Sequence, residues 1–215
     1  KLGVNLLLTA EQSERVLRET NMCFLFAQVY HSSMKYAAPV RKEMGVRTLF
    51  NILGPLSNPA GADLQLLGVY DPALAEPLAR VLQNLGVKRG LVVCGSDGLD
   101  EVTLTGPTLA YEICGTSVEK KEIVPAEFGL TICDRTALVG GSPAENAEIT
   151  RGILQGTVTG PKRHITVLNA GLGIYLGTPG ISMEEGVRKA TSVIDSGAAA
   201  EKLAQFVRAT VEVVK

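Results

Sequence analysis

The sequence is poor in the residues that build zinc or disulfide sites. It has only two histidines, four cysteines and no tryptophan among 215 residues. The cysteines are Cys23, Cys94, Cys114 and Cys133, and no two of them form a CxxC pair. This spacing argues against a structural zinc site. We expect all four thiols to be reduced and the protein to be cytoplasmic, since disulfides are rare in the cytosol.

Long apolar runs and a charge excess are also missing. No run reaches the roughly 18 apolar residues that a membrane-spanning helix needs. Lys and Arg number 21 and Asp and Glu 22, which gives a formal net charge of −1. We therefore expect neither a membrane nor a nucleic acid as partner, because both attract cationic surfaces. With 46% hydrophobic residues, the composition is that of a soluble globular protein, and we expect residues 1–215 to belong to one domain.

Phosphate-binding and nucleophile motifs are absent as well. The sequence contains no G-x-G-x-x-G run and no P-loop, and no Ser-His-Asp or Cys-His arrangement can be assembled. We therefore assign no catalytic acid, base or nucleophile. Any chemistry is expected to depend on electrostatic positioning of substrates.

The patterns that are present predict alternating strands and helices. Apolar runs predict strands at 64–70 and 90–94, and an intervening helix that begins with Asp71 as N-cap predicts parallel pairing of the two strands. The FLFA run at 24–27 is expected to be a short buried strand or turn. Further predicted elements are helices at 10–19, 32–44, 72–85, 143–156 and 162–176, two helices after Ser182, and β structure within 103–124. Capping boxes predict the helix starts that follow Thr9, Ser142 and Ser182. Gly171 and Gly173 indicate that the helix at 162–176 packs closely against another element. The fold class is therefore α/β, with helices dominating the last third of the chain.

A basic stretch within residues 23–60 is the most informative part of the chain. It carries His31, Lys35, Arg41 and Arg47 between an apolar run and the turn Gly-Pro-Leu-Ser-Asn-Pro at 54–59. A guanidinium can bind a carboxylate or phosphate through two hydrogen bonds. The stretch is consistent with a site that holds a small anion against an apolar wall, although a solvated amphipathic helix would show similar charges.

An acidic pair, Asp100-Glu101, follows the predicted strand at 90–94. Ligands of parallel α/β sheets bind beyond the carboxyl ends of the strands. Two carboxylates in such a loop suit Mg²⁺, which keeps several waters and often binds substrate phosphates. A solvated surface turn is the alternative interpretation.

The order of motifs resembles anthranilate phosphoribosyltransferase over nearly the whole chain. The shared motifs are FLFA at 24–27, His31, Met34-Lys35, PVR at 39–41, GVRT at 45–48, FN at 50–51, LGPL at 53–56, NPA at 58–60, Asp97-Gly98, Asp100-Glu101, AENA at 144–147, LNA at 168–170 and IDSG at 194–197.

This resemblance implies a fold, an activity and a set of site residues. The fold would be the large α/β domain shared with nucleoside phosphorylases, a central mixed sheet flanked by helices. The activity would be Mg²⁺-dependent transfer of phosphoribose from phosphoribosyl pyrophosphate (PRPP) to the amine of anthranilate, in tryptophan biosynthesis, by a homodimer. Anthranilate-binding residues would be Arg41, His31, Met34, Gly54 and Pro55, and metal-binding residues Asp100 and Glu101.

The sequence departs from this family pattern in one major respect. The family's Gly-rich GTGGD loop, KHGNR-type segment and NxST segment, which surround the phosphates and ribose, do not occur in these residues. The resemblance therefore implies a domain that is incomplete at its N-terminus and a chain that is inactive alone. Two other interpretations remain: a non-catalytic relative or fragment that binds a partner chain or nucleic acid, and an enzyme similar to pyrimidine nucleoside phosphorylase.

Overall fold

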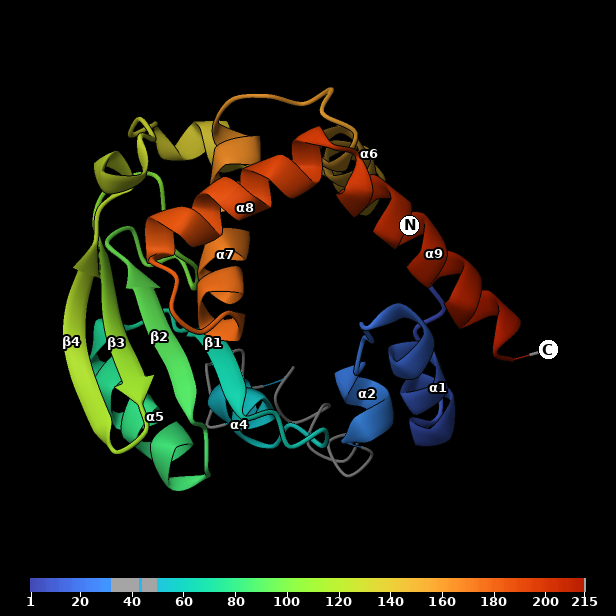
Figure 1. Ribbon diagram of the computed structural model, residues 1–215, viewed down its shortest axis with the longest axis horizontal. Coiled ribbons are helices and arrows are strands. Elements are labelled where there is room, and N and C mark those ends of the chain that lie inside the picture. The colour runs from blue at the N-terminus through green and yellow to red at the C-terminus, as the bar shows by residue number, and fades with distance from the viewer. Residues whose placement is uncertain (32–42, 44–49, 215) are drawn as a thin grey trace. The chain divides into compact units, whose positions relative to one another are not determined.

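The computed structural model describes residues 1–31, 43 and 50–214 (Figure 1). The predicted helices around 32–44 lie outside the described residues. The chain forms two compact units: unit 1 comprises Lys1–Pro59 and Ala198–Lys215, and unit 2 comprises Ala60–Gly197. The expectation that residues 1–215 belong to one catalytic domain stays a prediction.

Unit 1 is helical and combines both ends of the sequence. Within its described residues, the helices are α1 (Ala10–Thr20), α2 (Ala27–Tyr30), α4 (Phe50–Leu56) and α9 (Ala198–Glu212). Helix α1 begins with the predicted capping box, in which the Thr9 hydroxyl accepts from the Gln12 N–H at 3.2 Å. A small core of Leu8, Val16, Phe206 and Ala209 joins α1 to α9.

The FLFA run forms neither the buried strand nor the buried turn that we expected. Residues 24–26 have no regular secondary structure, and Phe26 is the extended N-cap of α2. The Phe24 side chain is 52% exposed and stacks on the ring of Phe26 at 6.3 Å. Four apolar residues in succession fit a strand or the entry to a helix equally well, because so short a run has no readable periodicity.

Unit 2 contains a mixed four-stranded sheet with strand order β1-β2-β3-β4. The strands are β1 (Leu64–Gly68), β2 (Arg89–Gly95), β3 (Thr108–Cys114) and β4 (Ser117–Ile123). Strands β1 and β2 are parallel and the other two pairs are antiparallel. Helix α5 (Pro72–Asn84) connects the parallel strands, and Asp71 caps it by accepting from the Ala73 N–H at 2.9 Å. The predicted β-α-β unit and the mixed sheet flanked by helices are confirmed.

The remaining elements of unit 2 follow the sheet in sequence. They are the short 3₁₀ helices η1 (Pro125–Phe128) and η2 (Arg135–Leu138), and the α-helices α6 (Pro143–Leu154), α7 (Pro161–Gly177) and α8 (Met183–Asp195). Helices α6 and α8 both begin with the predicted capping boxes, at Ser142 and Ser182. These boxes satisfy N–H groups that lack partners in the first turn of a helix.

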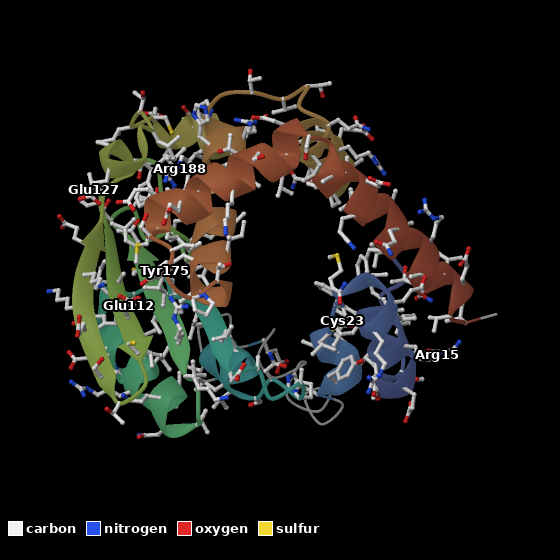
Figure 2. All side chains as sticks on the ribbon, in the orientation of Figure 1. Arg15, Cys23, Glu112, Glu127, Tyr175 and Arg188 are labelled. Carbon is white, nitrogen blue, oxygen red and sulfur yellow. The ribbon has the colours of Figure 1, made fainter. Side chains whose placement is uncertain are left out.

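Helices α5 and α7 cover opposite faces of the sheet. Neighbouring residues of β3 demonstrate this, since successive side chains of a strand point to opposite faces. The Tyr111 hydroxyl donates to Glu76 of α5 at 3.3 Å, whereas Glu112 accepts from the Tyr175 hydroxyl of α7 (Figure 2). Glu112 is buried and also pairs with Lys121 of β4. These contacts connect β3 and β4 to α7.

Helices α7 and α8 cross at two glycines. A Cβ on Gly171 would collide with the backbone of Val187, and a Cβ on Gly186 would collide with the Gly171 carbonyl oxygen. The close packing that we inferred from the glycines of α7 is therefore confirmed at Gly171. At Gly173 no atom lies within 4 Å of a Cβ position, so that glycine has no such role.

Candidate functional site

The acidic pair lies in a loop that leaves the carboxyl end of β2. Residues Gly90 to Gly95 of this strand are buried, and the chain then turns through Ser96, Asp97 and Gly98. The Gly98 N–H donates to the Gly95 carbonyl at 2.9 Å, and Gly98 has a φ of +78°, a conformation that glycine adopts without strain. We call residues 96–102 the acidic loop. Both of its predicted metal ligands, Asp100 and Glu101, are exposed.

Asp97 organises the first half of the acidic loop. Its carboxylate accepts from the Leu99 N–H at 3.2 Å and from the Thr103 hydroxyl at 3.1 Å. Burial alone would raise the pKa of Asp97, but hydrogen bonds from Leu99, Thr105 and Thr103 together lower it. Asp97 therefore stays ionised, and its carboxylate stabilises the loop by accepting these hydrogen bonds.

Gly68, the last residue of β1, lets the acidic loop approach the sheet. A Cβ at this position would overlap the backbone carbonyl of Asp100. Only glycine allows a backbone contact this close. The end of β1 therefore determines where the main chain of Asp100 lies.

Asn169 of α7 holds the second half of the loop. Its Oδ1 accepts from the Val102 N–H at 2.9 Å, and its Nδ2 donates to the Val102 carbonyl at 2.8 Å. Val102 is completely buried, so these backbone groups have no water to bind. The residue after Glu101 is thus fixed to a helix.

The two carboxylates of the pair repel each other, which favours a cation between them. Protein atoms around Glu101 raise its pKa by desolvation, and the adjacent charge of Asp100 raises it further. Within the described residues, no group of three or more His, Cys, Asp or Glu side chains is placed so that it could hold a metal ion. Two exposed carboxylates in a fixed loop nevertheless fit Mg²⁺, which takes one or two carboxylates and completes its shell with waters and phosphates.

The residues predicted for anthranilate fall elsewhere in the chain. Arg41 and Met34 lie outside the described residues. His31 follows α2 in unit 1 and is half-buried, and its backbone N–H donates to the Ala27 carbonyl at 2.8 Å. Gly54 and Pro55 lie within α4 of the same unit. The anthranilate site stays a prediction.

A cavity of about 600 Å³ opens beside the acidic loop. It is lined by the start of α5, the end of β2, the acidic loop, and strands β3 and β4 with the residue before β3. The lining residues are Pro72, Cys94, Gly95, Ser96, Gly98, Pro107, Leu109, Lys120, Lys121 and Glu122. Neither Asp100 nor Glu101 lines it. The cavity therefore adds no argument about the ligands of the acidic pair.

Fold and site together define a class: an α/β protein whose sheet presents an acidic loop at the carboxyl end of a parallel strand. Residues 1–200 match the sequence model described as "Glycosyl transferase family, a/b domain". The chain belongs to this family.

Within this family, the chain is similar to several anthranilate phosphoribosyltransferases. The chain is 54% identical over 206 residues, 96% of its length, to an anthranilate phosphoribosyltransferase of Ruminiclostridium cellulolyticum. It superposes on the crystal structure of the Thermus thermophilus anthranilate phosphoribosyltransferase with a TM-score of 0.89 at 43% identity, covering 97% of this chain and 62% of that one. A Saccharomyces cerevisiae anthranilate phosphoribosyltransferase in complex with PRPP and Mg gives a TM-score of 0.91 at 27% identity, covering 98% of this chain and 61% of that one. The chain spans 60% of the length of the Ruminiclostridium relative.

Sequence reasoning found the acidic pair but missed the residues that hold it. Asp97 and Asn169 belong to the motifs that carry the resemblance, yet nothing in the sequence assigned them a task. Gly68 gave no signal, because a glycine at the end of a strand is compatible with many turns. A spacing of 67 residues separates Asn169 from Val102, and only the folded chain brings them together.

Proposed function

We propose that this chain is part of an anthranilate phosphoribosyltransferase, which transfers phosphoribose from PRPP to the amine of anthranilate and releases pyrophosphate. One observation carries the proposal. The fold matches, at a TM-score of 0.91, a protein whose structure was determined with PRPP and Mg. The acidic loop adds a fixed pair of carboxylates suited to Mg²⁺ on a diphosphate.

The proposed reaction needs positioning more than acid–base catalysis. The neutral amine of anthranilate attacks the anomeric carbon of PRPP, the bond from that carbon to pyrophosphate breaks, and the amine loses a proton. Alignment of two bound substrates lowers such a barrier substantially. We assign the anthranilate carboxylate to Arg41, with His31, Met34, Gly54 and Pro55 around the ring.

The role of the acidic loop is to hold the metal against the substrate. Asp100 and Glu101 would bind Mg²⁺ directly, while Gly68, Asp97 and Asn169 fix the loop's main chain. The bound ion supplies neutralisation of the charge that develops on pyrophosphate. The protein itself contributes the rigid placement of the two carboxylates.

The cellular setting and assembly are part of the same proposal. All four cysteines are free, which supports a cytoplasmic protein. Within the described residues, no helix has both the length and the apolarity to cross a membrane. A homodimer is proposed from the family resemblance, and we expect no nucleic-acid partner because the net charge is −1.

The test measures the Mg²⁺ dependence of turnover in an active enzyme that contains this chain. Asp100→Asn and Glu101→Gln should each raise the Mg²⁺ concentration needed for half-maximal rate by about tenfold or more, because a carboxylate ligand is lost. The KM for anthranilate should change little. Phosphoribosylanthranilate formation from PRPP and anthranilate is followed by fluorescence.

Glu184→Gln is the matched control, because it also removes one exposed carboxylate from an adjacent pair, Glu184-Glu185. It should leave the Mg²⁺ curve unchanged. If the wild-type enzyme forms no phosphoribosylanthranilate, the proposed reaction is wrong. If the reaction occurs but Asp100→Asn and Glu101→Gln both behave like Glu184→Gln, the metal assignment is wrong.

A further inference from the structure

The side chain of Asn169 makes the same two hydrogen bonds to Val102 that a neighbouring peptide group would make. Its amide oxygen binds the Val102 N–H and its amide nitrogen binds the Val102 carbonyl. The same nitrogen donates to the Ile165 carbonyl of α7 at 3.0 Å. One side chain thus connects the helix backbone to the residue after Glu101.

We propose that Asn169 is a positioning residue for the metal: through its two bonds to Val102 it sets the direction in which the carboxylate of Glu101 points. This inference rests on the proposed function. It goes further because it assigns part of the metal affinity to a residue that does not touch the ion.

The geometry of the loop explains why one residue has this influence. Before the pair, Leu99 is fixed at both backbone groups: its N–H donates to Asp97, and its carbonyl accepts from the Gly95 N–H at 2.9 Å. After the pair, the Val102 backbone is held by Asn169. Only Asp100 and Glu101 lie between these two fixed points. Loss of the second point would free the main chain of Glu101 while leaving the Asp97 turn intact.

An amide is the group that this position requires. The Val102 N–H needs an acceptor, and two carbonyls, of Val102 and Ile165, need donors. Asparagine offers an oxygen acceptor and two N–H donors, whereas aspartate offers acceptors alone. A carboxylate here would face two carbonyl oxygens, and leucine, of similar volume, would make none of these bonds.

Metal binding without turnover is the first measurement. Mn²⁺ replaces Mg²⁺ and is titrated, in the presence of pyrophosphate, into an enzyme that contains this chain, with free Mn²⁺ detected by electron paramagnetic resonance. Asn169→Asp and Asn169→Leu should each weaken Mn²⁺ binding by about tenfold or more, a loss typical of residues that orient metal ligands.

Hydrogen exchange of the Val102 amide should accelerate in both variants without metal. In turnover assays, the Mg²⁺ concentration that gives half the maximal rate should rise. The KM for anthranilate, measured at saturating Mg²⁺, should stay within about twofold of the wild-type value.

Asn146 of α6 provides a matched control, because its side chain makes the same pair of bonds to another backbone. Its Oδ1 accepts from the Gly141 N–H at 2.8 Å, and its Nδ2 donates to the Gly141 carbonyl at 3.1 Å. Asn146→Asp and Asn146→Leu should leave Mn²⁺ affinity unchanged.

The outcomes separate this inference from the proposed function. If Asp100→Asn weakens Mn²⁺ binding and both Asn169 variants, folded by circular dichroism, bind Mn²⁺ as the wild type does, the positioning role is overturned and the metal assignment stands. If Asn169 and Asn146 variants weaken Mn²⁺ binding equally, the effect is general loosening and the inference is wrong. If Asp100→Asn has no effect either, the metal assignment itself fails.

Discussion

The functional residues that we propose for this chain are of two kinds. Some would touch the substrates, and others hold those residues in place. Arg41 belongs to the first group by its motif. A charge-assisted bond from a guanidinium to a carboxylate contributes about 1.5–3 kcal/mol. In an active enzyme that contains this chain, Arg41→Ala should therefore raise the KM for anthranilate by about tenfold or more.

Steady-state kinetics at saturating PRPP and Mg²⁺ measure this effect. Arg18→Ala is a suitable control, since it removes an exposed arginine that pairs with Glu14 across one helical turn. An unchanged KM for anthranilate in folded Arg41→Ala would remove Arg41 from the site.

At the scale of single residues, the sequence suggests candidate ligands but not the residues that hold them. Asp100 and Glu101 are candidates because carboxylates after a buried strand have a known chemistry. Asn169 and Gly68 are not, because their importance comes from partners 67 and 32 positions away in the chain. A short motif indicates what a side chain can bind, but it does not indicate which distant residues hold the loop in place.

Among the elements, the contact between α7 and α8 offers a test within one helix. A methyl group at Gly171 would meet the backbone of Val187, whereas one at Gly173 would enter open space. Gly171→Ala should therefore destabilise the protein by about 1–3 kcal/mol through overpacking. Gly173→Ala should stabilise it by about 0.5–1 kcal/mol, since alanine is the better helix former.

Urea unfolding followed by circular dichroism compares the two variants, each of which adds one methyl group to α7. Equal shifts in the free energy of unfolding would show that the helices do not cross at Gly171 as closely as described.

The polar contacts between the sheet and α7 predict a loss of stability in alkali. A hydrogen bond to Glu112 raises the pKa of Lys121, while desolvation, followed by the bond to Glu112, raises the pKa of Tyr175. A group with a raised pKa in the folded state stabilises the protein below its unfolded pKa, and this contribution disappears as the pH rises through the folded value. Stability should therefore fall as the pH rises above about 10.

The midpoint urea concentration of unfolding, determined between pH 8 and 11, measures this loss of stability. Removing one titrating group by Tyr175→Phe should make the decline shallower. Tyr30→Phe, which removes an exposed tyrosine hydroxyl bond in unit 1, should not. Parallel curves for Tyr175→Phe and the wild type would contradict the coupling to Glu112.

The elements themselves were largely readable from the sequence. Three capping boxes and the Asp71 cap predicted the starts of α1, α5, α6 and α8, because these caps are made by residues that are close in sequence. The FLFA run was misjudged because burial of a short apolar segment depends on distant partners.

On the scale of the whole molecule, composition and motif order predicted the α/β class and the family. The prediction that follows concerns activity: the 215 residues alone should not catalyse the transfer. They contain no Gly-rich loop of the kind whose backbone N–H groups bind phosphates. An assay with PRPP, anthranilate and Mg²⁺ should give no turnover above background.

Adding the N-terminal segment of a related anthranilate phosphoribosyltransferase as a separate chain provides the comparison. Turnover that depends on this addition would support the prediction. Turnover near that of a complete enzyme from the 215 residues alone would mean that the phosphates are bound without such a loop.

The grouping of both chain ends in unit 1 has a consequence for synthesis on the ribosome. Unit 2 is continuous from Ala60 to Gly197, whereas unit 1 needs α1, made early, and α9, made late. Val16 and Phe206 share one core, and the Thr20 carbonyl accepts from Lys202 across 182 positions. On the ribosome, α1 is therefore made well before α9, and the core that these two helices share cannot form until α9 has been synthesised.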